Sequence, residues 1–136
     1  MAEKITEKTE EEIPGIAYIY STNNNTFVHI TDLSGYTIAR VSGGMVTKHD
    51  RLKANPTVAL FVAKRAAEKA KEFKINALYV RIRGRGGKIN PLPGPGARSA
   101  VKSLAKEGLK ILSVIDVTRF PRGGPKPKGG RRGRRV

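Results

Sequence analysis

The sequence predicts an α/β domain with a mixed five-stranded sheet and two main helices, in the order β-β-β-α-β-α-β. Three observations predict this class. Three β-rich runs joined by short turns occupy residues 16–42, and a helix with strong start signals follows Asn55. An alternating strand, a Pro/Gly-rich loop, a second helix and a last apolar strand then fill residues 77–118.

The first three strands are expected at residues 16–22, 26–31 and 36–42, which are rich in β-branched and aromatic side chains. Three asparagines at 23–25 predict a tight turn, because Asn tolerates left-handed backbone angles, and residues 32–35 turn the chain again. The third strand should end at Gly43-Gly44. Such short connections predict an antiparallel meander.

The first helix should follow a polar connection at 47–53. Asn55 is a favoured N-cap and Pro56 suits the first helical position, so we expect the helix to run to about Phe73. Its many alanines suit close packing on a sheet. The positions expected to face inward are Val58, Val62, Ala66 and Phe73. Those expected to face water are Lys64, Glu68, Lys71 and Glu72.

The fourth strand, residues 77–83, alternates strictly. One face carries Leu78, Val80 and Ile82, and the other carries Tyr79, Arg81 and Arg83. A loop stiffened by prolines then leads into the second helix, and Gly94 and Gly96 allow a close approach that a Cβ would block. The inward face of this helix should hold Ala97, Ala100, Val101, Leu104 and Ala105. Residues 110–118 form the last strand, parallel to the fourth.

The charge of the chain is distributed in three parts. The formal net charge is +16, of which a mobile acidic arm at 1–12 carries −3 and a basic tail at 119–136 carries +8. This leaves +11 for an α/β RNA-binding domain at 13–118. A folded body with that excess repels itself unless an anion accompanies it, so nucleic acid is the leading partner and an acidic membrane surface the alternative.

Other compositional features exclude several classes. The chain has no cysteine, which excludes disulfides and zinc–thiolate sites. It has no apolar run long enough to span a membrane, and residues 1–12 lack the apolar core of a secretory signal. We therefore expect a cytoplasmic protein.

The residues predict no enzyme, cofactor, metal site or small-molecule substrate. His29 and His49 lack metal-ligand spacing, and we expect His29 to be a strand residue with a local hydrogen bond. The glycine-rich turn at 84–87 lacks a nucleotide-binding fingerprint. The β-β-β-α-β order also invites comparison with ribonuclease H-like nucleases, which need clustered carboxylates for divalent metals. The first strand, residues 16–22, contains no acid.

A basic constellation is the more persuasive signal. Within 26 positions, from 81 to 106, seven basic side chains occupy a strand face, a loop and a helix stripe: Arg81, Arg83, Arg85, Lys88, Arg98, Lys102 and Lys106. Phosphates are commonly bound by such side chains together with backbone N–H groups of glycine turns. Tyr79 could stack on a base or pack against the helix; the sequence leaves both open.

Several motifs occur together in one order: residues 24–32 (NNTFVHITD), 42–44 (SGG), 93–100 (PGPGARSA) and 115–118 (IDVT), followed by a basic tail. In this combination the chain resembles the family of small-subunit ribosomal protein eleven over roughly residues 14–136. The acidic arm and the ending of residues 129–136 resemble the archaeal and eukaryotic branch.

The resemblance implies a ribonuclease H-like α/β domain without catalysis. It implies binding to small-subunit ribosomal RNA on the platform, near the path of messenger RNA leaving the decoding region. Expected partners are this RNA and neighbouring platform proteins, with messenger RNA near the tail as a further candidate. The alternatives are a metal-dependent nuclease and a free basic nucleic-acid chaperone. The expected RNA-binding residues are Asn24, Asn25, Arg81, Arg83, Arg85, Lys88, Gly94, Gly96, Arg98, Lys102, Arg119, Arg122, Lys126, Lys128, Arg131, Arg132, Arg134 and Arg135.

Overall fold

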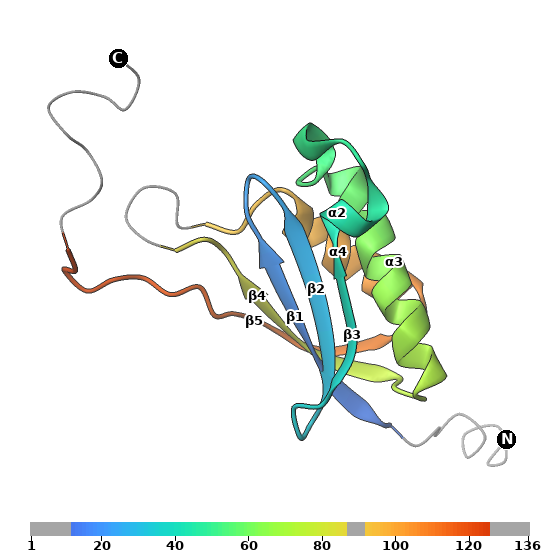
Figure 1. Ribbon diagram of the computed structural model, residues 1–136. Coiled ribbons are helices and arrows are strands. Elements are labelled where there is room, and N and C mark those ends of the chain that lie inside the picture. Colours follow the sequence, from blue (N-terminus) through green and yellow to red (C-terminus); the bar gives the residue numbers. More distant parts are fainter. Residues whose placement is uncertain (1–11, 87–91, 126–136) are drawn as a thin grey trace, which may run out of the picture.

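A mixed five-stranded sheet in the order β3-β2-β1-β4-β5 forms the centre of the computed structural model, which describes residues 12–86 and 92–125 (Figure 1). The strands are β1 (Pro14–Ser21), β2 (Thr26–Asp32), β3 (Thr37–Ser42), β4 (Ala77–Arg83) and β5 (Lys110–Asp116). β1 pairs antiparallel with β2 and parallel with β4, and β5 lies parallel to β4. The predicted mixed sheet and its element order are confirmed.

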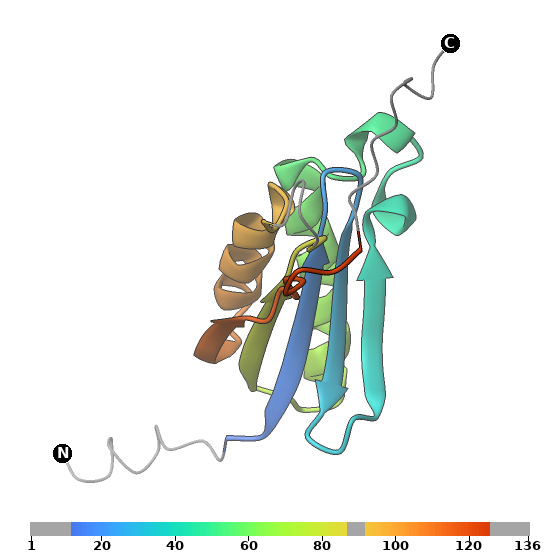
Figure 2. The same ribbon diagram turned by 90° about the vertical axis from the view of Figure 1, so that its left-hand side faces the viewer.

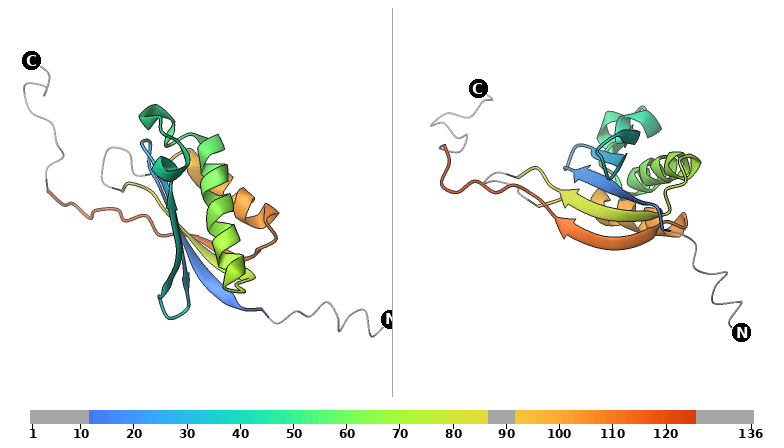
Figure 3. Two further views of the ribbon diagram at one scale, coloured as in Figure 1. Left: turned by 45° about the vertical axis from the view of Figure 1, so that its right-hand side comes forward. Right: turned by 90° about the horizontal axis from the view of Figure 1, so that it is seen from below.

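Both main helices cover the same face of the sheet (Figures 2 and 3). α3 (Pro56–Glu72) packs over β2 and β3, while α4 (Gly96–Lys106) packs against α3, β1 and β5. Asn55 caps α3 by accepting a hydrogen bond from the Thr57 N–H at 2.9 Å, as its sequence predicts. No described helix covers the opposite side of the sheet, which we call the open face.

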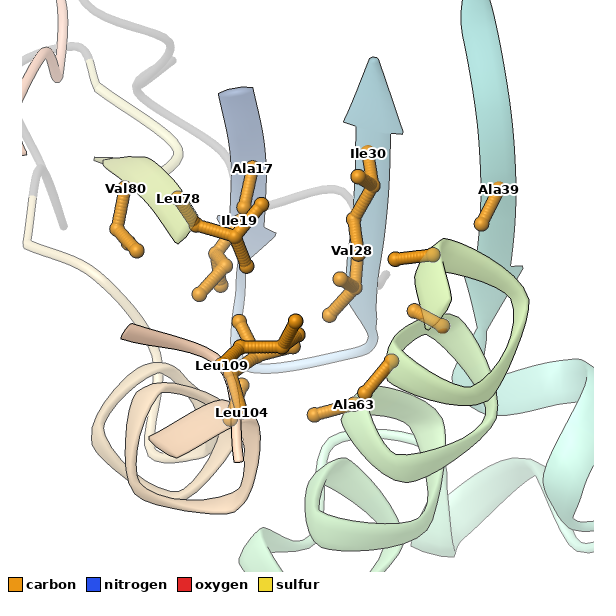
Figure 4. Close-up of a cluster of buried hydrophobic side chains, with 14 of the residues drawn as sticks. Ala17, Ile19, Val28, Ile30, Ala39, Ala63, Leu78, Val80, Leu104 and Leu109 are labelled. Atoms are coloured by element: carbon orange, nitrogen blue, oxygen red, sulfur yellow. The ribbon is translucent and has the colours of Figure 1, made fainter. Parts of the chain in front are cut away.

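The core lies between the sheet and the two helices (Figure 4). The largest fully buried side chains include Ile19, Ile30, Leu78 and Leu104. Burying one such side chain contributes roughly 1.5–3 kcal/mol. The buried face of α3 is mostly alanine, namely Ala59, Ala63, Ala66, Ala67 and Ala70, which lets the helix approach both the sheet and α4 closely.

Phe73 does not face inward as its spacing predicts, since 56% of its surface is exposed. The helix ends one residue earlier, at Glu72, and Lys74 turns the chain with a left-handed φ of 63°. Ile75, which is buried, belongs to the core instead.

Ala105 is also exposed, contrary to expectation. The buried face of α4 is centred on Ala100 and Leu104 and includes Ser103, whose hydroxyl donates to the Leu60 carbonyl of α3 at 2.9 Å. Packing against α3 therefore rotates the helix so that Ser103, and not Ala105, lies against its neighbour.

The bounds of β1, β2 and β3 differ from the sequence prediction by one or two residues, and two further differences lie after β3 and at the end of β5. The connection after β3 contains a short helix, α2 (Gly43–Val46), and a 3-10 turn at Asp50–Leu52, where we expected only a polar loop. β5 ends at Asp116, two residues early, because the Asp116 side chain folds back on Thr118.

The loop before α4 lies directly against the ends of β1 and β2. The Gly94 N–H donates to the Ser21 carbonyl at 3.0 Å, and a Cβ on Gly94 would collide with the Thr22 carbonyl. A Cβ on Gly96 would collide with the Thr26 hydroxyl and lie 2.9 Å from the Ala59 Cβ. The glycines at this junction are therefore required by the protein's own packing.

Gly96→Ala is expected to lower the free energy of unfolding by about 1–3 kcal/mol, because the junction must open to admit the methyl group. Gly44→Ala is the matched control, since its Cβ would meet only the flexible Lys53 side chain, at 3.4 Å, and its stability should stay within about 0.5 kcal/mol of the original. Urea denaturation followed by circular dichroism measures both. Equal stabilities would contradict the proposed packing constraint.

Candidate nucleic-acid interface

Aromatic and basic side chains meet in rows across the open face. Paired residues of neighbouring strands project to the same face of a sheet, so the register defines each row. One row runs Arg40, His29, Tyr18 and Arg81, and the next runs Ser42, Phe27, Tyr20 and Arg83. Neither row contains an acidic side chain.

The two β4 arginines lie on tyrosine rings of β1. The Arg81 guanidinium carbon is 5.9 Å from the Tyr18 ring centroid, and that of Arg83 is 5.1 Å from Tyr20. Tyr20 in turn stacks on Phe27, with centroids 5.9 Å apart and planes at 27°. These cation–π and stacking contacts hold the arginines on the surface and leave their N–H groups free to donate to a ligand.

The rings on the open face are accessible from solvent. Exposed fractions are 36% for Tyr18, 37% for Phe27 and 40% for Tyr79. Tyr79 therefore does not pack against a helix, and its other role, stacking on a base, stays a prediction. His29 bonds Thr37 through its Nε2 at 2.9 Å, which confirms its expected local hydrogen bond.

A cavity of about 390 Å³ continues the open face beyond the carboxyl ends of β1 and β4. Amide, hydroxyl and guanidinium groups dominate its lining, with one tyrosine and one leucine: Tyr20, Thr22, Asn23, Asn24, Arg85 and Leu92. Arg85 extends the series of Arg81 and Arg83, and Tyr20 belongs to both the cavity and the aromatic row. The cavity thus combines charge, hydrogen-bonding groups and an aromatic ring.

The two asparagines of the β1–β2 turn differ in their surroundings. Asn24 is exposed at the cavity, and its backbone N–H donates to the Thr22 hydroxyl at 3.2 Å. The half-buried Asn25 accepts through Oδ1 from the Thr26 N–H at 2.8 Å and the Gly43 N–H at 3.1 Å. Asn25 therefore ties the turn to the start of α2, while Asn24 is available to a ligand.

The basic stripe of α4 lies on the other side of the molecule. Arg98, Lys102 and Lys106 are all exposed, but α4 covers the face of the sheet opposite to Arg81 and Arg83 (Figure 3). In the described part of the chain none of these five forms a salt bridge; nearby Glu107 pairs instead with Lys71 of α3, at 3.7 Å. The basic residues that lie close together in the sequence therefore form two separate surfaces in the structure, one on the open face and one on α4.

The tail leaves the sheet beside Arg85. The Val117 N–H donates to the Ile82 carbonyl at 2.8 Å, and the Thr118 hydroxyl accepts from the Gly84 N–H at 2.9 Å. Thr118 also donates to Asp116, through its hydroxyl at 2.5 Å and its N–H at 2.9 Å. These bonds hold the pKa of the Asp116 carboxyl below its usual range, with the hydroxyl as the larger cause.

Arg119 and Arg122 are exposed on the segment that follows β5, which runs away from α3 and α4 (Figure 1). The Arg119 backbone lies against Gly86, where a Cβ would collide with its carbonyl. Seven expected RNA-binding residues lie outside the described residues: Lys88, Lys126, Lys128, Arg131, Arg132, Arg134 and Arg135.

The aromatic residues of β1 and β2 that lie beside Arg81 and Arg83 are not among the sites predicted from the sequence. Their signal was present: Tyr18, Tyr20, Phe27 and His29 occupy the strand positions that alternate with buried ones. Their alignment with Arg81 and Arg83 depends on the β1–β4 pairing, which no local pattern reveals.

Metal-binding clusters and membrane-spanning helices are both absent from residues 12–86 and 92–125. That part contains no group of three or more His, Cys, Asp or Glu side chains placed to hold a metal ion. It also contains no helix long and apolar enough to cross a membrane.

The family model described as Ribosomal protein S11 matches residues 15–132. The chain belongs to the ribosomal protein S11 family.

Membership of the S11 family makes the chain a structural, non-enzymatic protein of the small ribosomal subunit. The matched range contains every strand from β2 to β5, both main helices and all but the first residue of β1. It also contains the open face, the cavity and the α4 stripe, and it leaves out the acidic arm.

Replacing Thr118 by Val should raise the pKa of Asp116 toward its ordinary value of 3.8, because the larger of its two stabilising hydrogen bonds is lost. Because the pKa of Asp116 is lowered in the folded protein, its ionised carboxylate stabilises the folded state above pH 3.8. This stabilisation is lost as the pH falls through the folded-state pKa.

A carboxyl-carbon NMR titration of this S11-family chain measures the shift. Asp32 is the internal control, since its pKa is lowered by a hydrogen bond from the Ser34 hydroxyl and should not change. An unchanged Asp116 pKa in Thr118→Val would contradict the assigned cause.

Proposed function

We propose that this S11-family protein binds small-subunit ribosomal RNA directly, on the platform of the subunit near the path by which messenger RNA leaves the decoding region. It does so in the cytoplasm as a member of the archaeal and eukaryotic branch, next to neighbouring platform proteins. The acidic arm and the basic ending are the features that support this branch.

The proposal rests on one observation: each side of the sheet carries basic side chains that have no acidic partner. Arg81 and Arg83 on the open face and Arg98 and Lys102 on α4 have no carboxylate partner in the described part of the chain. Each such side chain releases a counterion when it neutralises a phosphate, which favours binding to RNA. Two opposed basic surfaces suit a protein inserted between RNA segments.

The remaining expected sites divide by accessibility. Asn24, Arg85 and Arg119 are exposed near one end of the open face, and we propose that they contact RNA there. We propose that Arg122, which is exposed on the segment leading away from β5, contacts RNA beyond it. Gly96 is buried, so its contribution would be to seat α4 and thereby its stripe. Messenger RNA remains a proposed partner of the tail.

Sucrose-gradient fractionation of cells that express the tagged chain tests the function. We expect the protein to migrate with small subunits and to be scarce in the free fraction. The matched variant Arg98→Gln/Lys102→Gln should be depleted from subunits, whereas Lys64→Gln/Lys69→Gln on α3 should not. A free pool that predominates in all three strains would favour the alternative of a free nucleic-acid chaperone.

A second prediction concerns the proposed division into an arm at 1–12, a domain at 13–118 and a tail at 119–136. Deleting residues 121–136 removes none of the core, which ends with β5. The free energy of unfolding, measured by thermal denaturation, should therefore stay within about 1 kcal/mol of that of the full chain.

The same truncation removes seven of the eight tail charges and should sharply reduce incorporation into small subunits. Co-sedimentation in competition with the full chain measures the effect. Equal incorporation of both forms would show that the tail is dispensable.

A further inference from the structure

The open face and the cavity together display features that phosphate binding alone does not require. Lysine and arginine suffice to neutralise phosphates, and a double-stranded RNA is bound mostly through its shape, its phosphates and its 2′-hydroxyl groups. Accessible aromatic rings add the ability to stack on bases, which is possible only where the bases are unpaired. Here Tyr18, Phe27 and Tyr79 expose more than a third of their surface on the same face as Arg81 and Arg83.

We infer that the open face and its cavity bind a segment of unpaired RNA, with bases stacked on the tyrosines and one nucleotide seated in the cavity. This inference rests on the proposed function and deepens it, because it assigns unpaired nucleotides to one of the two basic surfaces.

The path of such a segment follows β4. Arg81, Arg83 and Arg85 alternate along this strand and the residues after it, so their side chains emerge at intervals of roughly 6.5–7 Å. Tyr18 and Tyr20 lie beside the first two arginines in the same register. The series thus offers a cation for a phosphate at each step and ends at Arg85 in the cavity. The exposed rings of Tyr18 and Tyr79 are the ones open to bases, because Tyr20 is already in contact with Arg83 and Phe27.

The cavity suits a nucleotide in size and lining. Its volume of about 390 Å³ exceeds that of a base with its ribose, and Tyr20 forms part of its wall. The Asn23 and Asn24 amides carry both donors and acceptors, which match the edge of an unpaired base, and Arg85 can bind its phosphate. An apolar segment of a neighbouring protein would leave these amides and the guanidinium unpaired, at a cost.

The probes are a 12-nucleotide oligouridine and an RNA duplex of equal length, added to the full chain at several salt concentrations. The variant Tyr18→Leu/Tyr79→Leu keeps apolar bulk and removes the rings. We expect its affinity for oligouridine to fall at least about tenfold, because stacking on one ring is worth about five- to a hundredfold. Its salt dependence should not change, and neither should its affinity for the duplex.

Two controls separate stacking from charge and from misfolding. Tyr36→Leu replaces an exposed tyrosine in the β2–β3 turn and should leave all affinities unchanged. Arg83→Gln should weaken binding and reduce the salt slope by about 1.

Fluorescence of the original chain gives an independent measurement. The chain has four tyrosines and no tryptophan, so its fluorescence reports mainly on Tyr18, Tyr20 and Tyr79 and should be quenched by oligouridine.

Several outcomes would overturn the inference. These are equal affinity of the tyrosine variant and the original chain for oligouridine, an equal loss for the duplex, or no quenching of the original chain. Quenching needs no variant and so decides the matter even if the double substitution unfolds. If the tyrosine variant still co-sediments with small subunits and binds RNA normally, the inference fails while the proposed function stands. If the original chain is absent from small subunits, the proposed function itself fails.

Discussion

The arrangement of this molecule depends on the contact between the 94–96 segment and the ends of β1 and β2. Gly94 and Gly96 lie so close to Thr22 and Thr26 that no side chain fits between them. Ser21 and Thr26 are fully buried there, and their hydroxyls have no hydrogen-bond partner among the described residues. Burying these unpaired hydroxyls lowers stability, so the tight junction forms at a cost in free energy. The contact sets where α4 begins and brings Leu92 to the cavity formed with the β1–β2 turn.

Because α4 begins at that junction, it completes the cover of one face of the sheet and leaves the other free. The chain thus presents two different basic surfaces. The α4 stripe is a row of flexible cations on a helix, suited to phosphates of any RNA. The open face holds arginines against rings at 5.1–5.9 Å, so its cations are fixed in position and accompanied by aromatic surface.

Much of this fold follows from local sequence patterns. The cap at Asn55, the alternation of β4 and the parallel β4–β5 pairing are all confirmed. The two inward positions that were wrong depended on which side chain the core accepts. Phe73 is exposed because α3 ends before it and Ile75 enters the core instead. Ala105 is exposed because Ser103 faces α3 and donates to its Leu60 carbonyl. The two basic surfaces could not be separated from sequence spacing, since Arg83 and Arg98 are close in the chain yet lie on opposite sides of the sheet. Tyr18 and Arg81 are far apart in the chain and adjacent in space.

The central position of β1 has a consequence for how the chain folds as it is synthesised. Its partner on one side, β2, follows immediately in the chain. Its partner on the other side, β4, begins about sixty residues later, and the Ile13 N–H donates across the same interval to the Asn76 side chain. Until β4 has emerged, one edge of β1 has unpaired backbone groups and Ile19 lacks its neighbour Ile82. The β1–β3 meander can form early from local contacts, but the core closes only when the last third of the chain is available. Nascent chains of this protein therefore have a period of exposure in which an edge strand needs protection from aggregation.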